Sequence, residues 1–377
     1  MAGIYIHIPF CKTKCPYCDF FSVTETAYKQ KLIRSIQQEL QLQQNYLKDQ
    51  KIETIYFGGG TPTFVSFQHI EAMINQIYKS YSVVEAPEIT IECNPDDLSK
   101  SYLKELMQIA DFRINLGVQS FNEKELKFLQ RRHSVDKSVI ALTDIFDLGF
   151  DNVGLDIIYG LPGSNLADLE INLKTAFQFP IHHLSAYHLT IEQQTPFYQQ
   201  MVNGDFKEIS EEMSRQQFFL LIEMAKNYGF EHYEISNFAR DAAYSKHNTS
   251  YWKGIPYLGV GPSAHSFDGS FRQWNVSNLR KYVQEIEQGK LPFKEEKLSL
   301  RDRFNEYLMV SLRTKWGIEL NEMNAYFKSF MDAEFTRKID YYLNSGLMNQ
   351  SNNRIYLSEE GKFLSDSIIL ELFVSGP

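Results

Sequence analysis

Residues 1–22 read MAGIYIHIPFCKTKCPYCDFFS, and this stretch decides the fold class of the chain. Residues 3–9 form a short run of β-branched and aromatic residues that ends at a proline, which is typical of a strand. Three cysteines follow at once, at Cys11, Cys15 and Cys18. A tight cluster of this kind favours a metal site over disulfides, so the sequence predicts that the first strand leads directly into a metal-binding loop.

The strand and the segment after it belong to a unit that repeats along the chain. Helix-like patterns are expected at residues 25–47, 66–81, 99–109, 122–129, 135–148 and 166–177. The strand-like runs between them are ETIYFGGG (53–60), EITIECNP (88–95), FRINLGVQS (112–120), NVGLDIIYGLP (152–162) and HHLSAYHLT (182–190). Because parallel neighbours need crossover connections, this alternation predicts an α/β fold in which six β/α units form a partial (β/α)6 barrel.

The predicted strands end in residues that suit chemistry better than core packing. Cys11 follows the first strand, and Glu92, Gln119 and Asp156 lie near the ends of later ones. In barrels of parallel strands, the loops after the carboxyl ends of the strands build the site. The sequence therefore predicts one functional site at this end of an incomplete barrel.

The alternation ends after about residue 233, so the remaining chain is predicted to form other parts. We expect a barrel at 1–240, a connecting region at 241–297 and a mostly helical domain at 298–377. The connecting region is rich in Gly, Ser, Asn and aromatic residues without a clear period, and residues 290–297 are expected to be a solvated linker. Near the C-terminus, residues 347–357 are typical of a small hairpin between helices, a winged-helix-like arrangement.

Composition excludes several classes of function. The 377 residues include 47 acidic and 38 basic side chains, a formal net charge of −9, which disfavours sequence-independent binding to nucleic acid and gives no polybasic patch for a membrane. No run approaches the ~18 apolar residues of a membrane span and the first residues lack a signal-peptide pattern, so a cytoplasmic protein is expected. The fourth cysteine, Cys93, lies in a predicted strand and is expected to be a buried apolar residue.

Three clustered thiolates limit the kind of metal centre. Structural zinc takes four protein ligands, and no further Cys or His stands nearby at zinc-finger spacing. Three thiolates suit a 4Fe–4S cluster with one iron left open. The turn Gly58-Gly59-Gly60-Thr61-Pro62 after the second predicted strand would let the backbone approach a ligand closely, although the same composition also fits an ordinary tight turn.

The CxxxCxxC loop and the GGGTP turn together resemble the radical S-adenosylmethionine superfamily. The resemblance implies that the open iron binds the amino and carboxylate groups of S-adenosylmethionine, and that an electron delivered through the cluster cleaves its sulfonium to a 5′-deoxyadenosyl radical. It therefore also implies an electron donor for the cluster. The resemblance narrows to the oxygen-independent coproporphyrinogen III oxidase group through IYIHIPFCKTKCPYCDFFS, YFGGGTPT, IECNPD, NLGVQSF, RRH, GLDIIYGLPG and LSAYHLTIEQQTPFY.

This family resemblance assigns roles to matching residues. Tyr5, Gly59 and Glu92 match positions that contact cluster-bound S-adenosylmethionine. A second nucleoside site is matched by Tyr17, Gly60, Thr61, Gln119, Arg131 and Asp156. Carboxylates can accept hydrogen bonds from ribose hydroxyls, and an arginine can pair with a carboxylate. Each of these residues, taken alone, also fits an ordinary polar cap or turn.

Two departures from the oxidase pattern favour another branch. Phe20 stands where the oxidase has a fourth cysteine, and the long N-terminal extension of the oxidase is not seen before the first predicted strand. The chain has instead an HNxxYW motif, formed by His247, Asn248, Tyr251 and Trp252, that is similar to the heme-chaperone branch of the family. This branch binds heme and hands it to acceptor proteins, and the resemblance suggests a cluster-dependent homodimer and peripheral membrane contact.

The sequence leaves alternatives for both the motif and the function. A histidine is a common axial ligand of heme iron and aromatic rings can lie on the macrocycle, but His247 could equally make a structural hydrogen bond while Tyr251 and Trp252 anchor a loop. A heme chaperone is the leading hypothesis, an oxygen-independent coproporphyrinogen III oxidase is the second, and a radical enzyme that modifies tRNA or protein is the third. Other candidate iron ligands are His7, His133, His183, His188, His232 and His265.

Overall fold

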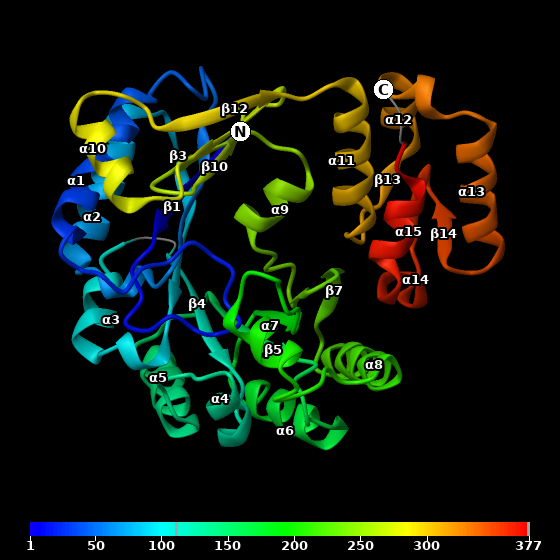
Figure 1. Cartoon of the computed structure of the whole chain (residues 1–377), viewed down its shortest axis with the longest axis horizontal. Coiled ribbons are helices and arrows are strands. Elements are labelled where there is room, and N and C mark those ends of the chain that lie inside the picture. The colour runs from blue at the N-terminus through cyan, green and yellow to red at the C-terminus, as the bar shows by residue number, and fades with distance from the viewer. Residues whose placement is uncertain (110–111, 375–377) are drawn as a thin grey trace.

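The computed structural model describes residues 1–109 and 112–374 and contains an open barrel of parallel strands (Figure 1). Six strands are hydrogen-bonded side by side in sequence order, each parallel to the next. They are β1 (Ala2–Ile8), β2 (Ile52–Gly59), β3 (Val83–Cys93), β4 (Phe112–Gln119), β5 (Val153–Tyr159) and β6 (His183–His188). The predicted partial (β/α)6 barrel is confirmed.

The helices between these strands cover the outer face of the barrel. They are α1 (Lys29–Leu42), α2 (Phe67–Ser80), α3 (Lys100–Leu106), α4 (Glu123–Phe128), α5 (Val135–Asp147) and α6 (Leu166–Ala176). The starts of α3, α5 and α6 are set locally: the side chains of Ser99, Ser134 and Asn165 each accept a hydrogen bond from a backbone N–H in the first turn. These caps explain why the starts of these helices follow closely from the sequence.

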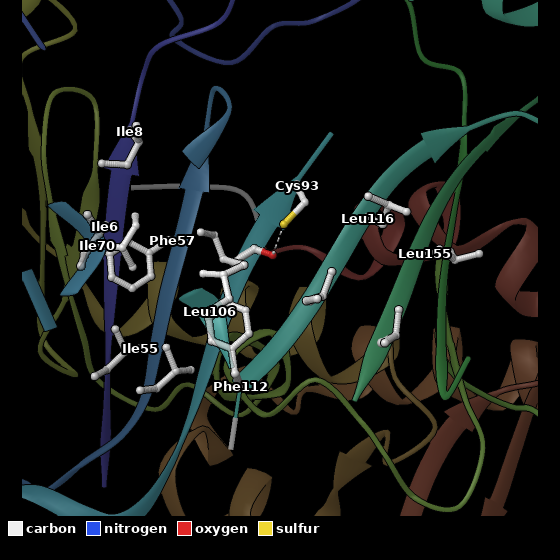
Figure 2. Close-up of a cluster of buried hydrophobic side chains, with 14 of the residues drawn as sticks. Ile6, Ile8, Ile55, Phe57, Ile70, Cys93, Leu106, Phe112, Leu116 and Leu155 are labelled. Atoms are coloured by element: carbon white, nitrogen blue, oxygen red, sulfur yellow. Dashed lines mark hydrogen bonds between the residues drawn. The ribbon is translucent and has the colours of Figure 1, made fainter. Parts of the chain in front are cut away.

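The apolar core lies between the strands and the helices, on the outer face of the sheet. Figure 2 shows Ile6, Ile55 and Phe57 from the first two strands beside Ile70 of α2, all fully buried. The strands are buried on both faces, as expected of parallel strands, but the residues that alternate with these apolar ones face the barrel interior and include buried polar side chains such as Thr54 and Arg113. Cys93 is buried at the end of β3, and its thiol contacts the carbonyl oxygen of Ile91 at 3.6 Å, as expected for a small core residue.

The sheet is larger than the sequence predicts. Four short strands, β9 (Tyr257–Val260), β10 (His265–Phe267), β11 (Phe271–Asn275) and β12 (Phe293–Lys297), extend it beyond β1, while β8 (Asn237–Ala239) and β7 (Glu231–Glu234) extend it beyond β6. The expectation of a solvated linker at 290–297 was wrong, because β12 pairs with β11 along its whole length as an exposed edge strand. Its run of charged residues fits a protected sheet edge.

Further helices lie along the chain between β6 and the C-terminal part. They are α7 (Pro196–Val202), α8 (Glu211–Asn227), α9 (Lys246–Trp252) and α10 (Leu279–Glu287). In Figure 1, α9 lies between the barrel strands and α11 (Leu300–Leu312). This placement brings the predicted HNxxYW motif to the junction between barrel and C-terminal part.

The C-terminal part has its own hydrophobic core and a small sheet ordered β13-β15-β14. The predicted hairpin is confirmed: β14 (Met348–Ser351) and β15 (Arg354–Leu357) are joined by Asn352 and Asn353, which both have positive φ. Two asparagines in this conformation fit a two-residue hairpin turn. The remaining elements are β13 (Ile318–Glu319), α12 (Leu320–Tyr326), α13 (Ala333–Asn344), α14 (Glu359–Phe363) and α15 (Ser365–Leu372). Within the described ranges, no helix combines the length and apolar character needed to span a membrane.

Candidate functional site

A cavity of about 420 Å³ lies at the carboxyl ends of the barrel strands, where the sequence predicts the site. We call it the thiol cavity. It brings together all of the residues predicted for the cluster and for S-adenosylmethionine except Tyr5, which lines a neighbouring cavity. The residues collected there are Cys11, Cys15, Cys18, Tyr17, Gly59, Gly60, Thr61, Glu92, Gln119, Arg131 and Asp156. Asn94, Asn115 and Tyr187 also line this cavity. The sequence singles out the strand ends that carry Asn94 and Tyr187 but assigns neither residue a role, and it gives no signal for Asn115, which lies within β4.

The cysteine loop and the glycine turn are joined through their backbones. The amide of Gly60 donates to the carbonyl oxygen of Ile8 at 2.8 Å, and the amide of Thr61 donates to that of Phe10 at 2.8 Å. The Thr61 hydroxyl also lies 3.7 Å from the Cys11 sulfur as a donor. The two loops therefore form one rigid unit, and a shift of the glycine turn moves the thiols.

Arg131 ties the thiols to the far wall of the cavity. Its guanidinium donates to the Cys15 sulfur at 3.6 Å, to the Tyr17 hydroxyl at 3.4 Å and to the carbonyl oxygen of Gly117 at 3.0 Å, and it also donates to the side chain of Asn94. Its Nε has no partner among the described residues. A cation beside thiolates stabilises their charge, which fits a bound anionic cluster better than a neutral core.

The three cysteines are arranged as an iron–sulfur cluster requires, and not as a single metal ion requires. No three His, Cys, Asp or Glu side chains of residues 1–109 and 112–374 converge as they would on a single metal ion. The three free cysteines instead line one cavity. Each thiolate of a cubane binds a different iron, so its sulfurs surround the cluster rather than meet at a point. Burial raises the pKa of Cys11 and Cys18, so iron binding would have to displace protons there.

Two carboxyl groups of the thiol cavity accept hydrogen bonds from neighbouring donors, and burial raises the pKa of both. Glu92 accepts from the Tyr56 hydroxyl at 2.8 Å and from the Gly59 amide at 3.3 Å, and burial raises its pKa to about 7. Asp156 accepts from the Asn115 side-chain amide at 2.8 Å, and burial raises its pKa to about 6. One Asp156 oxygen is buried without a partner among the described residues. An acceptor of this kind fits a ligand that brings hydroxyl or amine donors.

The backbone at Gln119 supports the same interpretation. Gln119 has a φ of 69°, in the left-handed region that a residue with a side chain rarely adopts. It ends β4, and the strand register shifts at this position against β5. Strained residues of this sort are common at ligand sites, because the surrounding structure must hold them in place.

The pKa of Glu92 leads to a testable pH dependence. If the carboxylate accepts hydrogen bonds from S-adenosylmethionine, its ionised fraction should limit binding, and that fraction rises about tenfold between pH 6 and pH 8 for a pKa near 7. We expect the affinity measured by calorimetry on the reconstituted protein to rise by a similar factor. In the Glu92→Gln variant the Glu92 contribution should disappear, leaving weaker binding with a flatter pH profile. A wild-type profile that is flat, or that falls with rising pH, would contradict this role.

A second cavity of about 1270 Å³ adjoins the thiol cavity, because Phe20, Glu92 and Tyr187 line both. We call it the junction cavity, since residues of β1, α9, β10, β11 and α11 contribute to its walls. All four motif residues His247, Asn248, Tyr251 and Trp252 line it, and so does Tyr5. The sequence could not predict this cavity, because its walls come from segments far apart along the chain.

The structure places His247 as a held, internal side chain. It is 1% exposed; its Nδ1 lies 2.8 Å from the Thr54 hydroxyl and its Nε2 lies 2.8 Å from the Tyr251 hydroxyl. The ring stacks on Tyr56 with centroids 5.0 Å apart, and burial lowers its pKa to about 3. Both ring nitrogens are used, so the contacts favour the structural alternative for His247, with Tyr251 anchored through it.

A barrel with three cysteines in its first loop and a glycine turn in its second defines a protein of the radical S-adenosylmethionine class. The sequence model of the Radical SAM superfamily matches residues 5–176, and that of the HemN C-terminal domain matches residues 298–364. Membership of this superfamily implies a 4Fe–4S cluster and S-adenosylmethionine as its cofactors. The chain belongs to the heme chaperone HemW family, as its similarity to curated members demonstrates.

The relatives match almost the whole chain. Heme chaperone HemW of Bacillus subtilis (strain 168) is 30% identical over 373 residues, covering 98% of each chain. Heme chaperone HemW of Lactococcus lactis (strain IL1403) is also 30% identical, covering 97% of this chain and 95% of the relative. Among solved structures, coproporphyrinogen III oxidase (HemN) from Escherichia coli has a TM-score of 0.84 at 20% identity, covering 99% of this chain and 90% of that one. The last similarity shows a shared fold.

Proposed function

We propose that this protein is a heme chaperone, which binds heme in the junction cavity and passes it to acceptor proteins. The observation that carries the proposal is the composition of that cavity in a chain whose curated relatives are named heme chaperones. It is large and lined by aromatic rings, among them Tyr257, Phe267 and Trp316, with arginines at Arg272, Arg303 and Arg354. Heme is a flat macrocycle with two carboxylates, so its site needs aromatic rings that lie against the macrocycle and arginines that pair with the carboxylates.

The thiol cavity would hold the cofactors of the superfamily. Cys11, Cys15 and Cys18 would bind three irons of a 4Fe–4S cluster, and the bound cluster can supply one electron for cleavage of S-adenosylmethionine. Thr61 and Arg131 donate toward the cysteine sulfurs. The carboxyl groups of Glu92 and Asp156 would accept hydrogen bonds from the bound nucleoside, with Tyr5, Tyr17, Gly59, Gly60 and Gln119 completing the walls.

The second candidate function is that of an oxygen-independent coproporphyrinogen III oxidase. The reason to consider it is the fold similarity to HemN. Such an enzyme would remove hydrogen from two propionate side chains and release carbon dioxide. Phe20 speaks against it: the side chain is 67% exposed and lies between both cavities, where the resemblance expects a fourth cysteine. A phenyl ring offers no thiol at that position.

The proposal extends to partners, place and domains. The protein would work in the cytoplasm with an electron donor for its cluster, without nucleic acid, and as a cluster-dependent homodimer that can touch a membrane peripherally. Its functional parts would be the barrel (1–240), the motif-bearing connection (241–297) and the C-terminal domain (298–377). The connection would also extend the barrel sheet, since its strand β9 pairs directly with β1.

One anaerobic experiment tests the function. The cluster is reconstituted, heme is titrated by absorbance, and the same sample is assayed with S-adenosylmethionine, a reductant and coproporphyrinogen III. We expect heme binding in a fixed ratio, transfer of that heme to an apo-hemoprotein, and no protoporphyrinogen IX. Formation of protoporphyrinogen IX would support the oxidase, and failure to bind heme would overturn the proposal.

A further inference from the structure

We infer that His265 is the protein ligand of heme iron in the junction cavity, and that Arg303 pairs with a heme propionate. The inference rests on the proposed function and names the side chains that would carry it. His265 lies on β10, outside the HNxxYW motif. Arg303 lies on α11, across the junction between the barrel and the C-terminal part.

The cavity contains three histidines, and two are already engaged. His7 is buried, with its Nε2 2.9 Å from the carbonyl oxygen of Phe21 and its Nδ1 3.2 Å from the Tyr5 hydroxyl. His247 is held in the same way by Thr54 and Tyr251. To bind iron, either ring would have to leave both of its partners. Loss of such buried contacts costs stability, because the partner groups remain without hydrogen bonds.

His265 is free of these constraints. Its side chain is exposed to the cavity, and its ring makes no hydrogen bond within the described part of the chain. The ring stacks on Trp274 with centroids 6.2 Å apart, a contact that uses neither nitrogen. Partial burial, and the nearby Arg272, lower the pKa of His265, which favours the neutral imidazole. A neutral imidazole is the form that binds metal.

The three arginines of the junction cavity differ in whether they already have a partner in the chain. Arg272 forms an ion pair with Glu306 at 2.8 Å, and Arg354 donates to the carbonyl oxygen of Trp316 at 3.0 Å. Arg303 stands three residues before Glu306 on the same helix, is exposed, and has no ion pair among the described residues. It is therefore the arginine that can bind a carboxylate without breaking an existing contact.

The iron ligand is tested by comparing two tetrapyrroles on the full-length reconstituted protein. We expect His265→Ala to weaken heme binding by about 10–100-fold or more and to change the heme absorption spectrum, while the affinity for iron-free protoporphyrin IX stays as in the wild type. Free imidazole should restore the wild-type spectrum in His265→Gly. His69→Ala on α2, outside both cavities, is the matched control.

The same titration with His247→Ala separates the alternatives. We expect His247→Ala to lower the unfolding temperature while keeping the wild-type heme spectrum. If heme binding and spectrum survive in His265→Ala but the iron-dependent spectrum is lost in His247→Ala, the ligand inference is overturned and the heme-chaperone proposal stands. If the wild type binds no heme, the proposed function itself fails.

A separate set of titrations tests the contact between Arg303 and the propionate. Arg303→Gln should weaken heme and protoporphyrin IX alike, by about tenfold, and should lose this effect when the porphyrin is supplied as its dimethyl ester. Arg301→Gln, two positions earlier on α11 and outside the cavity, is the control. An equal loss for acid and ester would mean that Arg303 supports the helix and does not bind the propionate.

Discussion

Replacing Cys11, Cys15 or Cys18 singly by serine is expected to abolish the iron–sulfur chromophore after anaerobic reconstitution. All three thiols line one cavity, and the fourth cysteine that lines it, Cys93, is buried with its thiol directed at the carbonyl oxygen of Ile91. A cubane that already has one open iron would keep only two protein ligands. We therefore expect near-complete loss of bound iron and acid-labile sulfide, measured per protein chain, in each variant.

The control for this experiment is Cys93→Ala. Cys93 lines the same cavity but is 4% exposed, and burial raises its pKa far above the usual range, so it cannot readily supply a thiolate. Cys93→Ala should keep the cluster at some cost in stability, because it removes a buried sulfur. Iron and sulfide contents that stay at the wild-type level in the three serine variants, or that vanish only in Cys93→Ala, would refute the ligand set.

The barrel could be predicted because its signals are local. Each β/α unit carries its own apolar run, cap and turn, and parallel strands are buried on both faces, so their sequences differ clearly from their helices. The strands β9 to β12 lacked such signals. They have three to five residues each, pair with antiparallel partners in part, and expose charged side chains on the edge strand β12. Only tertiary pairing with β1 defines them as part of the sheet.

The two cavities also differ in how far the sequence predicts them. The thiol cavity could be predicted because barrel topology places all strand ends together, and only the interactions between them, such as Asn94 with Thr61 and Arg131, required the structure. The junction cavity depends on how α9, β10 and α11 meet, which no local pattern encodes. For this reason the sequence points to the histidine of the motif, His247. In the structure both ring nitrogens of His247 have hydrogen-bond partners, whereas His265 lines the junction cavity.

Gly60→Ala is expected to have the second large effect, on both stability and S-adenosylmethionine binding. A Cβ at this position would lie 2.7 Å from the Pro9 carbonyl carbon and 2.8 Å from the Phe10 carbonyl oxygen. These are backbone atoms of the segment that leads into Cys11, so no side-chain rotation can relieve the clash. The glycine turn and the cysteine loop must separate, with an expected loss of about 1–3 kcal/mol in the free energy of unfolding.

Binding should suffer beyond this loss of stability, because the separation also moves Thr61 away from the Cys11 sulfur. We expect at least about a tenfold weaker affinity for S-adenosylmethionine by calorimetry, even at temperatures where the variant is fully folded. Gly163→Ala is the matched control: Gly163 has a φ of 79°, but a Cβ there meets no atom within 4 Å. It should cost roughly 1 kcal/mol through backbone strain alone and leave the affinity unchanged. Equal behaviour of the two variants would show that close packing of the two loops is not what shapes the cofactor site.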